Sequence, residues 1–267
     1  MKSWSKEAGL VAFLLVIPGV LHAESVALLA TKDNTLIESG SGHLSDGSGP
    51  GIRAGRTGQP MGSIRRAVVA FDIAAAVPAG AEILDVRLIL QMAQANSGPL
   101  PVSVHRLLAD WGEGDSSFPG GQGAPSEPGD ATWIHRFYDT DFWGTPGGDF
   151  MTSPSATALV GGPGIYEWSD PEMVADVQLW LDLPAANYGW LTLGDESASS
   201  SVKRFHSRES GSPGIPPLLL VDYAPPDGDD EDPDDEDDDR NSTGYLAPRL
   251  ERVPSTGGRP HAVAPKG

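Results

Sequence analysis

The chain has 267 residues, a formal net charge of -19 and no cysteine. The absence of cysteine excludes a disulfide framework, a cysteine-ligated zinc or iron–sulfur site and a thiol nucleophile. The acidic balance argues against DNA or RNA as a partner, because phosphate backbones bind to basic surfaces. The length fits either one large β domain or two small domains.

Residues 1–23 have the pattern of a secretory signal peptide. Lys2 and Lys6 precede an apolar run over 10–21, and Ala23 is a small residue before a cut. This run is shorter than the ~20 residues that a membrane-spanning helix needs; an uncleaved N-terminal anchor is the alternative. We therefore expect a protein that is secreted or held at the cell surface, and that does not span a membrane after signal cleavage.

Residues 24–226 are predicted to form one all-β domain. Short runs of β-forming residues recur between clusters of Gly, Pro, Ser and Asn, which is typical of an antiparallel sandwich. Along 83–92 the apolar residues alternate with others and are predicted to share one buried face. These residues are Leu84, Val86, Leu88, Leu90 and Met92. The other predicted strands cover 26–31, 34–38, 66–72, 101–108, 131–137, 165–168, 188–193, 202–207 and 217–223.

One helix is predicted, over 171–183. Its apolar residues recur at helical spacing, Pro171 suits a first turn and Pro184 stops the helix. Together these elements predict a jelly-roll-type antiparallel β-sandwich with one short helix and a long Trp-bearing loop.

The long loop is predicted over 110–166. Loops of this length are usually functional or disordered, and three tryptophans argue against disorder. Trp111 and Trp143 either stack on the apolar faces of sugar rings or pin the loop to the sandwich as additional core. Trp133, which is flanked by strand-like residues, is predicted to belong to the core.

The carboxylates of this loop allow two interpretations. Glu113, Asp115, Asp130 and Asp149 either form an oxygen-ligand Ca²⁺ site that orders the loop or are solvated. A glycosidase needs two carboxylates at a defined separation, and the sequence does not identify such a pair. Since G-x-S-x-G, P-loop and H-E-x-x-H motifs are also absent, we predict no enzymatic activity and assign no catalytic residue.

The segment 203–209 is a basic strand in an acidic domain. Strand alternation places Lys203 and Phe205 on one face and Arg204, His206 and Arg208 on the other. The face with the two arginines either holds an acidic sugar or pairs with carboxylates of the domain itself.

The C-terminal part of the chain begins with a run of acidic residues. Residues 227–239 hold 11 acidic residues in 13 and predict a solvated linker, with a Ca²⁺ site as the alternative. Residues 240–267 are rich in Pro and Gly and predict a disordered tail.

The stretch KDNTLIE over 32–38 resembles the D-N-x-L-x-E signature of DNRLRE domains, a group that includes carbohydrate-binding module family 96. Supporting pieces follow in order at 65–72, 83–90, 110–114, 131–133, 147–150, 176–180, 187–190 and 204–209. This resemblance covers about residues 25–224. It implies a secreted jelly-roll β-sandwich, often attached to polysaccharide-active enzymes, with alginate binding in characterised members.

One departure from the family bears on the ligand. The two arginine positions of the signature hold Thr35 and Ile37 here. Residues 24–226 carry 11 basic and 24 acidic residues, a net charge of -13, so they repel a polyanion such as alginate. Binding of such a ligand then needs a local basic patch or a bridging Ca²⁺ ion, and Ca²⁺ is the only cofactor that the sequence suggests.

The sequence therefore predicts a non-catalytic module that binds an extracellular polysaccharide. The alternative is a structural or adhesive protein of the cell surface or matrix without a specific glycan ligand, and a hydrolase or lyase is a third hypothesis. The predicted ligand-binding residues are Trp111, Glu113, Trp143, Asp149, Arg204 and Arg208.

Overall fold

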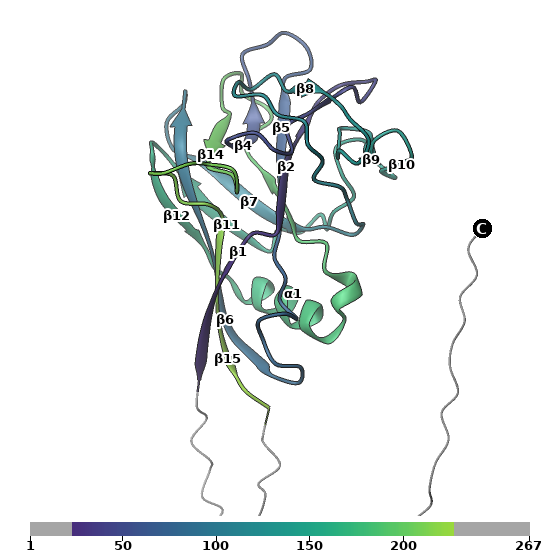
Figure 1. Ribbon diagram of the computed structural model, residues 1–267. Helices are drawn as coiled ribbons and strands as arrows, with labels where there is room; N and C mark the ends of the chain where they lie inside the picture. Colours follow the sequence, from purple (N-terminus) through teal and green to yellow (C-terminus); the bar gives the residue numbers. More distant parts are fainter. Residues whose placement is uncertain (1–22, 227–267) are drawn as a thin grey trace, which may run out of the picture. The chain divides into compact units, whose positions relative to one another are not determined.

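The computed structural model describes residues 23–226, which form antiparallel, curled β-sheets with one α-helix (Figure 1). The predicted all-β sandwich is therefore confirmed. The predicted signal peptide, except Ala23, lies outside the described residues, as do the acidic run 227–239 and the tail 240–267. Within 23–226, no helix is long and apolar enough to cross a membrane.

Two groups of antiparallel strands build the sandwich, and β4 (Ile52–Arg56) joins them by pairing with a strand of each. The first group is β1 (Glu24–Leu29), β15 (Leu218–Ala224), β6 (Glu82–Ala95), β12 (Gly164–Trp168) and β14 (Lys203–Phe205). The second group is β2 (Lys32–Ile37), β5 (Ile64–Ala70), β13 (Trp190–Leu193), β7 (Leu100–Arg106) and β11 (Ala156–Val160). Two short pairs lie outside them: β3 (Leu44–Ser45) with β8 (Ala124–Pro125), and β9 (His135–Phe137) with β10 (Asp141–Phe142).

The long strand β6 follows the predicted alternation over most of its length. Its apolar residues from 86 to 92 are buried as predicted, but Leu84 is 41% exposed and Ile83 is buried in its place. The prediction for Leu84 is wrong because β15 shifts register against β6 next to Ile83. A one-residue shift at a bulge turns the following side chains to the opposite face of the sheet.

The helix α1 (Pro171–Asp182) begins at the predicted residue and ends one residue before the predicted end. Asp170 caps it by accepting a hydrogen bond from the backbone N–H of Glu172, which satisfies one of the free donors of the first turn. Its apolar stripe packs on the core, where the rings of Trp180 and Trp190 are 4.5 Å apart between centroids. A 3-10 turn, η1 (Pro184–Ala186), leads back to the sheet.

One carboxylate on the buried face of α1 connects the helix to three other segments. Asp176 Oδ2 accepts hydrogen bonds from Trp190 Nε1 at 2.9 Å and from Ser155 Oγ at 2.6 Å. Its Oδ1 lies 2.8 Å from Nε of Arg106 in β7. The acid is therefore paired on both oxygens, as a buried charge must be.

The predicted long loop is more regular than expected. Residues 110–166 contain β11 and the first part of β12, together with the short strands β8, β9 and β10. In contrast, the strand predicted over 131–137 contracts to β9, because the backbone at Thr132 turns and bonds to His135 instead of a partner strand. The short strands around 124–142 lie at the upper right in Figure 1, away from α1.

Candidate functional site

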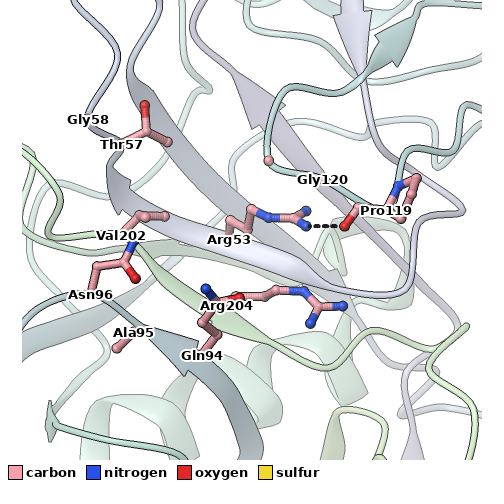
Figure 2. Close-up of a pocket in the computed structure, with 11 residues that line it drawn as sticks. Arg53, Thr57, Gly58, Gln94, Ala95, Asn96, Pro119, Gly120, Val202 and Arg204 are labelled. Atoms are coloured by element: carbon pink, nitrogen blue, oxygen red, sulfur yellow. Dashed lines mark hydrogen bonds between the residues drawn. The ribbon is translucent and has the colours of Figure 1, made fainter.

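A pocket of about 240 Å³ opens where β4, β14 and the end of β6 meet the loop around Pro119 (Figure 2). The pairing of these three strands places Arg53, Arg204 and Gln94 opposite one another in one row. Because directly opposite residues point to the same side of a sheet, the row lines one face of it. The full lining is Arg53, Thr57, Gly58, Gln94, Ala95, Asn96, Pro119, Gly120, Gly121, Val202 and Arg204.

Three hydrogen bonds hold the Arg53 guanidinium in this pocket. Its Nη1 donates to Asp46 Oδ2 at 2.8 Å and to the Gly51 carbonyl at 2.9 Å, and its Nη2 donates to the Pro119 carbonyl at 3.3 Å. Burial lowers the pKa of Arg53 from its usual value, against the opposing effect of the Asp46 charge. Burial likewise raises the pKa of Asp46.

Arg204 lines the same pocket and has one unpaired donor. Its Nη2 donates to the Pro50 carbonyl at 2.8 Å, while its Nε is buried without a hydrogen-bond partner. Figure 2 shows its side chain running alongside that of Arg53. Asp46 pairs with Arg53 and also feels the charge of Arg204, so one carboxylate is set against two guanidiniums and a local excess of positive charge remains within an acidic domain.

The lining suits recognition of an anionic, hydroxyl-bearing ligand. Guanidinium groups donate paired hydrogen bonds to carboxylates, and the amides of Gln94 and Asn96 both donate to and accept from hydroxyls. The eleven lining residues include no carboxylate or imidazole, so none of these side chains supplies the general acid or base of glycoside hydrolysis.

A second polar cluster joins three segments that are distant in the sequence. Asp33 in β2, Glu113 after β7 and Glu209 after β14 each place a carboxylate oxygen so that these oxygens lie within 4.8 Å of one another. Asp33 is fully buried. Its pKa is raised to about 8, mainly by burial; a backbone hydrogen bond from Arg208 opposes this rise, and the charges of Glu209 and Glu113 add to it. Burial also raises the pKa of Glu113.

Arg208 is the counter-charge of this cluster. Its Nε lies 3.0 Å from Glu113 Oε1 and its Nη2 lies 3.1 Å from Glu209 Oε1. Its backbone N–H donates to Asp33 Oδ2 at 2.7 Å. Three carboxylates thus meet one guanidinium, and Asp33 Oδ1 and Glu209 Oε2 are buried without a hydrogen-bond partner.

The two tryptophans predicted to bind sugar belong to the core. Trp111 is 1% exposed and donates from Nε1 to the Tyr188 carbonyl at 2.9 Å; Trp143 is 5% exposed and donates to the Thr132 carbonyl at 2.9 Å. Both rings pack in a second apolar cluster beside β2, β5 and β13, and Trp133 packs against it as predicted. The stacking role of Trp111 and Trp143 is therefore wrong, because a buried ring offers no face to a ligand.

The remaining predicted residues separate into three places. Arg204 lines the pocket, whereas Glu113 and Arg208 contact each other in the carboxylate cluster. Asp149 lies in neither: its oxygens accept the backbone N–H groups of Gly144 and Thr145 and close a turn. Of the two interpretations of the basic strand, internal pairing describes Arg208, and a free donor remains at Arg204.

The predicted calcium grouping of four loop acids does not assemble among residues 23–226. Asp130 is buried and bonded to Ser116 and to the backbone N–H of Glu127, and Asp115 is exposed. Glu113 instead joins acids from β2 and from the segment after β14. The sequence does not indicate this cluster of three acids, because Asp33 and Glu209 lie 176 positions apart.

Comparison with protein-family models and with curated proteins finds no match to this chain.

Proposed function

We propose that this chain is a secreted, non-catalytic, DNRLRE-like module that binds an extracellular polysaccharide through the pocket of Arg53 and Arg204. The observation that supports it is the row of Arg53, Arg204 and Gln94 across three paired strands, with a buried and unpartnered Arg204 Nε. Burying an unpaired guanidinium donor is costly, and an anion beside the same guanidinium offsets its charge.

The local charge favours an acidic sugar over a neutral one. A uronate carboxylate placed between the two guanidiniums accepts from Arg204 and offsets the excess positive charge of the pocket. The amides of Gln94 and Asn96, which also line the pocket, then bond ring hydroxyls. With a volume of about 240 Å³ the pocket holds a small part of a polymer, so one sugar residue enters while its neighbours lie across the sheet.

Binding is tested by calorimetric titration of the full chain with oligosaccharides of uronic acids, in the presence and absence of Ca²⁺, with neutral oligosaccharides as the comparison. We expect an acidic saccharide to bind, and its affinity to fall as salt rises, because salt screens charges beyond ~10 Å at 0.1 M. If no acidic polysaccharide binds with or without Ca²⁺, the proposal fails and the structural or adhesive function takes its place.

The variant Arg204→Gln locates the site. Losing hydrogen bonds from a charged donor costs ~1.5–3 kcal/mol, so the affinity for the acidic saccharide falls by about ten-fold or more. The matched control is Arg87→Gln, which removes a half-buried arginine of β6 that pairs with Asp85 and Asp222 outside the pocket. Equal affinities for Arg204→Gln and the unaltered chain would place the saccharide elsewhere.

A further inference from the structure

We propose that Asp33, Glu113 and Glu209 bind one Ca²⁺ ion, which connects β2 to the segments that follow β7 and β14. The inference is independent of the proposed function, because ion binding is measured without any saccharide.

The spacing of the three carboxylates fits a single ion. Ca²⁺ binds oxygens at 2.3–2.6 Å, so two oxygens on one ion are at most about 4.8 Å apart for bonds of about 2.4 Å. One oxygen of each residue lies within that separation of the other two. The donors are all carboxylates, which hard cations such as Ca²⁺ prefer, and the group contains no imidazole to favour a transition metal.

The unpartnered oxygens supply a second and separate reason. Asp33 is 0% exposed, and its Oδ1 accepts no hydrogen bond although its Oδ2 does. Glu209 Oε2 is also buried without a partner. The hydrogen bonds of the cluster therefore leave two buried oxygens, from two different segments, unsatisfied. A buried carboxyl oxygen needs a partner, and a cation satisfies both of these oxygens at once.

The charge count agrees with a divalent ion. With all three carboxylates ionised around a bound ion they carry three negative charges, and Arg208, which contacts Glu113 and Glu209, carries one positive charge. The remaining two negative charges equal the charge of one Ca²⁺. Arg208 occupies one side of the cluster, because its guanidinium engages Glu113 and Glu209 while only its backbone reaches Asp33.

Calcium binding is measured by calorimetric titration of chelator-treated full-length chain with CaCl₂, and with MgCl₂ as the comparison. We expect a site with a Kd on the order of 10⁻⁴ to 10⁻³ M, the range of extracellular modules with few charged ligands. The acidic run 227–239 is present in every variant, so any ion that it takes up is a common background.

Three variants and one control separate this site from that background. Glu209→Gln removes one ligand and weakens Ca²⁺ binding by about ten-fold or more, and Asp33→Asn does the same. The matched control Asp115→Asn removes an exposed acid two positions from Glu113 and leaves the affinity unchanged. Arg208→Gln removes the competing cation and tightens Ca²⁺ binding, whereas a cluster that serves only as an ion-pair network gains no affinity from this change.

Equal Ca²⁺ titrations for the unaltered chain and Glu209→Gln would overturn the proposal. Equal affinities for Mg²⁺ and Ca²⁺ in both proteins would also overturn it, because acidic residues that take up cations without selectivity give that result. If Asp33→Asn does not fold, the Ca²⁺ titration of Glu209→Gln still tests the proposal, because Glu209 is partly exposed. Circular dichroism of the Ca²⁺-free Glu209→Gln variant checks that its fold is intact.

Discussion

Replacing Asp176 by alanine tests how α1 is held to the sandwich. The change leaves the indole N–H of Trp190, which is 0% exposed, without an acceptor, and an unsatisfied buried donor costs ~1–3 kcal/mol. It also removes the ion pair of Arg106, whose side chain is 24% exposed. Because solvent screens a pair at that exposure, its loss adds about 1 kcal/mol. The free energy of unfolding should therefore fall by about 2–4 kcal/mol.

Urea unfolding followed by circular dichroism measures this loss. The midpoint should fall while the slope with denaturant stays constant, because the surface exposed on unfolding is nearly unchanged. The control Asp182→Ala removes an exposed acid at the C-terminal end of α1 and should cost about 0.5 kcal/mol or less. If both variants lose the same small amount, the hydrogen bonds of Asp176 do not hold the helix, and its role as the anchor of α1 is refuted.

Two further changes test the burial of aromatic and imidazole rings. Trp143→Ala should lower the free energy of unfolding by ~3–5 kcal/mol through the cavity that it leaves; a stable variant that only loses saccharide affinity would instead mean that the ring is a binding surface. Burial lowers the pKa of His105, whose Nδ1–H donates to the Met151 carbonyl and whose Nε2 accepts from Ser103. Protonation below pH about 6.5 therefore favours the unfolded chain. Urea unfolding at pH 8 and pH 5.5 should show that acid lowers the free energy of unfolding less in His105→Gln than in the unaltered chain. An equal decrease in both proteins would contradict this assignment.

Alternation and helical spacing predict the elements that bury one continuous face. The inner residues of β6 from 86 to 92 and the stripe of α1 follow their patterns because packing against a common core enforces the period. The same alternation correctly places Lys203 beside Phe205 on the inner face. It does not indicate the partners of this lysine, whose ammonium donates to carbonyls of Ser97, Gly98 and Gly161.

The candidate site is less visible in the sequence, because its residues break these patterns. In β4, Arg53 and Gly55 interrupt the apolar residues, so the strand that carries half of the pocket's positive charge has no hydrophobic signature. Asp33 lies inside a buried strand, where burial of a carboxylate costs free energy. The residues that this carboxylate joins, Glu113 and Glu209, lie far along the chain. Finally, the sequence around a tryptophan in a long loop is the same whether its ring faces solvent or the core. Only tertiary contacts, such as the hydrogen bond from Trp111 to the Tyr188 carbonyl, decide between the two.

The pairing of β1 with β15 determines how the sandwich responds to a pulling force. The first residue of β1, Glu24, lies opposite Tyr223 near the end of β15, and their side chains are hydrogen-bonded at 2.8 Å, so the chain enters and leaves at the same end (Figure 1). Tension applied at Glu24 and Ala224 acts across this ladder and breaks its hydrogen bonds one pair after another, beginning at that end. A load carried by one of these ends alone does not cross the ladder. The sandwich therefore resists force poorly when tension passes through both ends, and it is better suited to attachment through one end only.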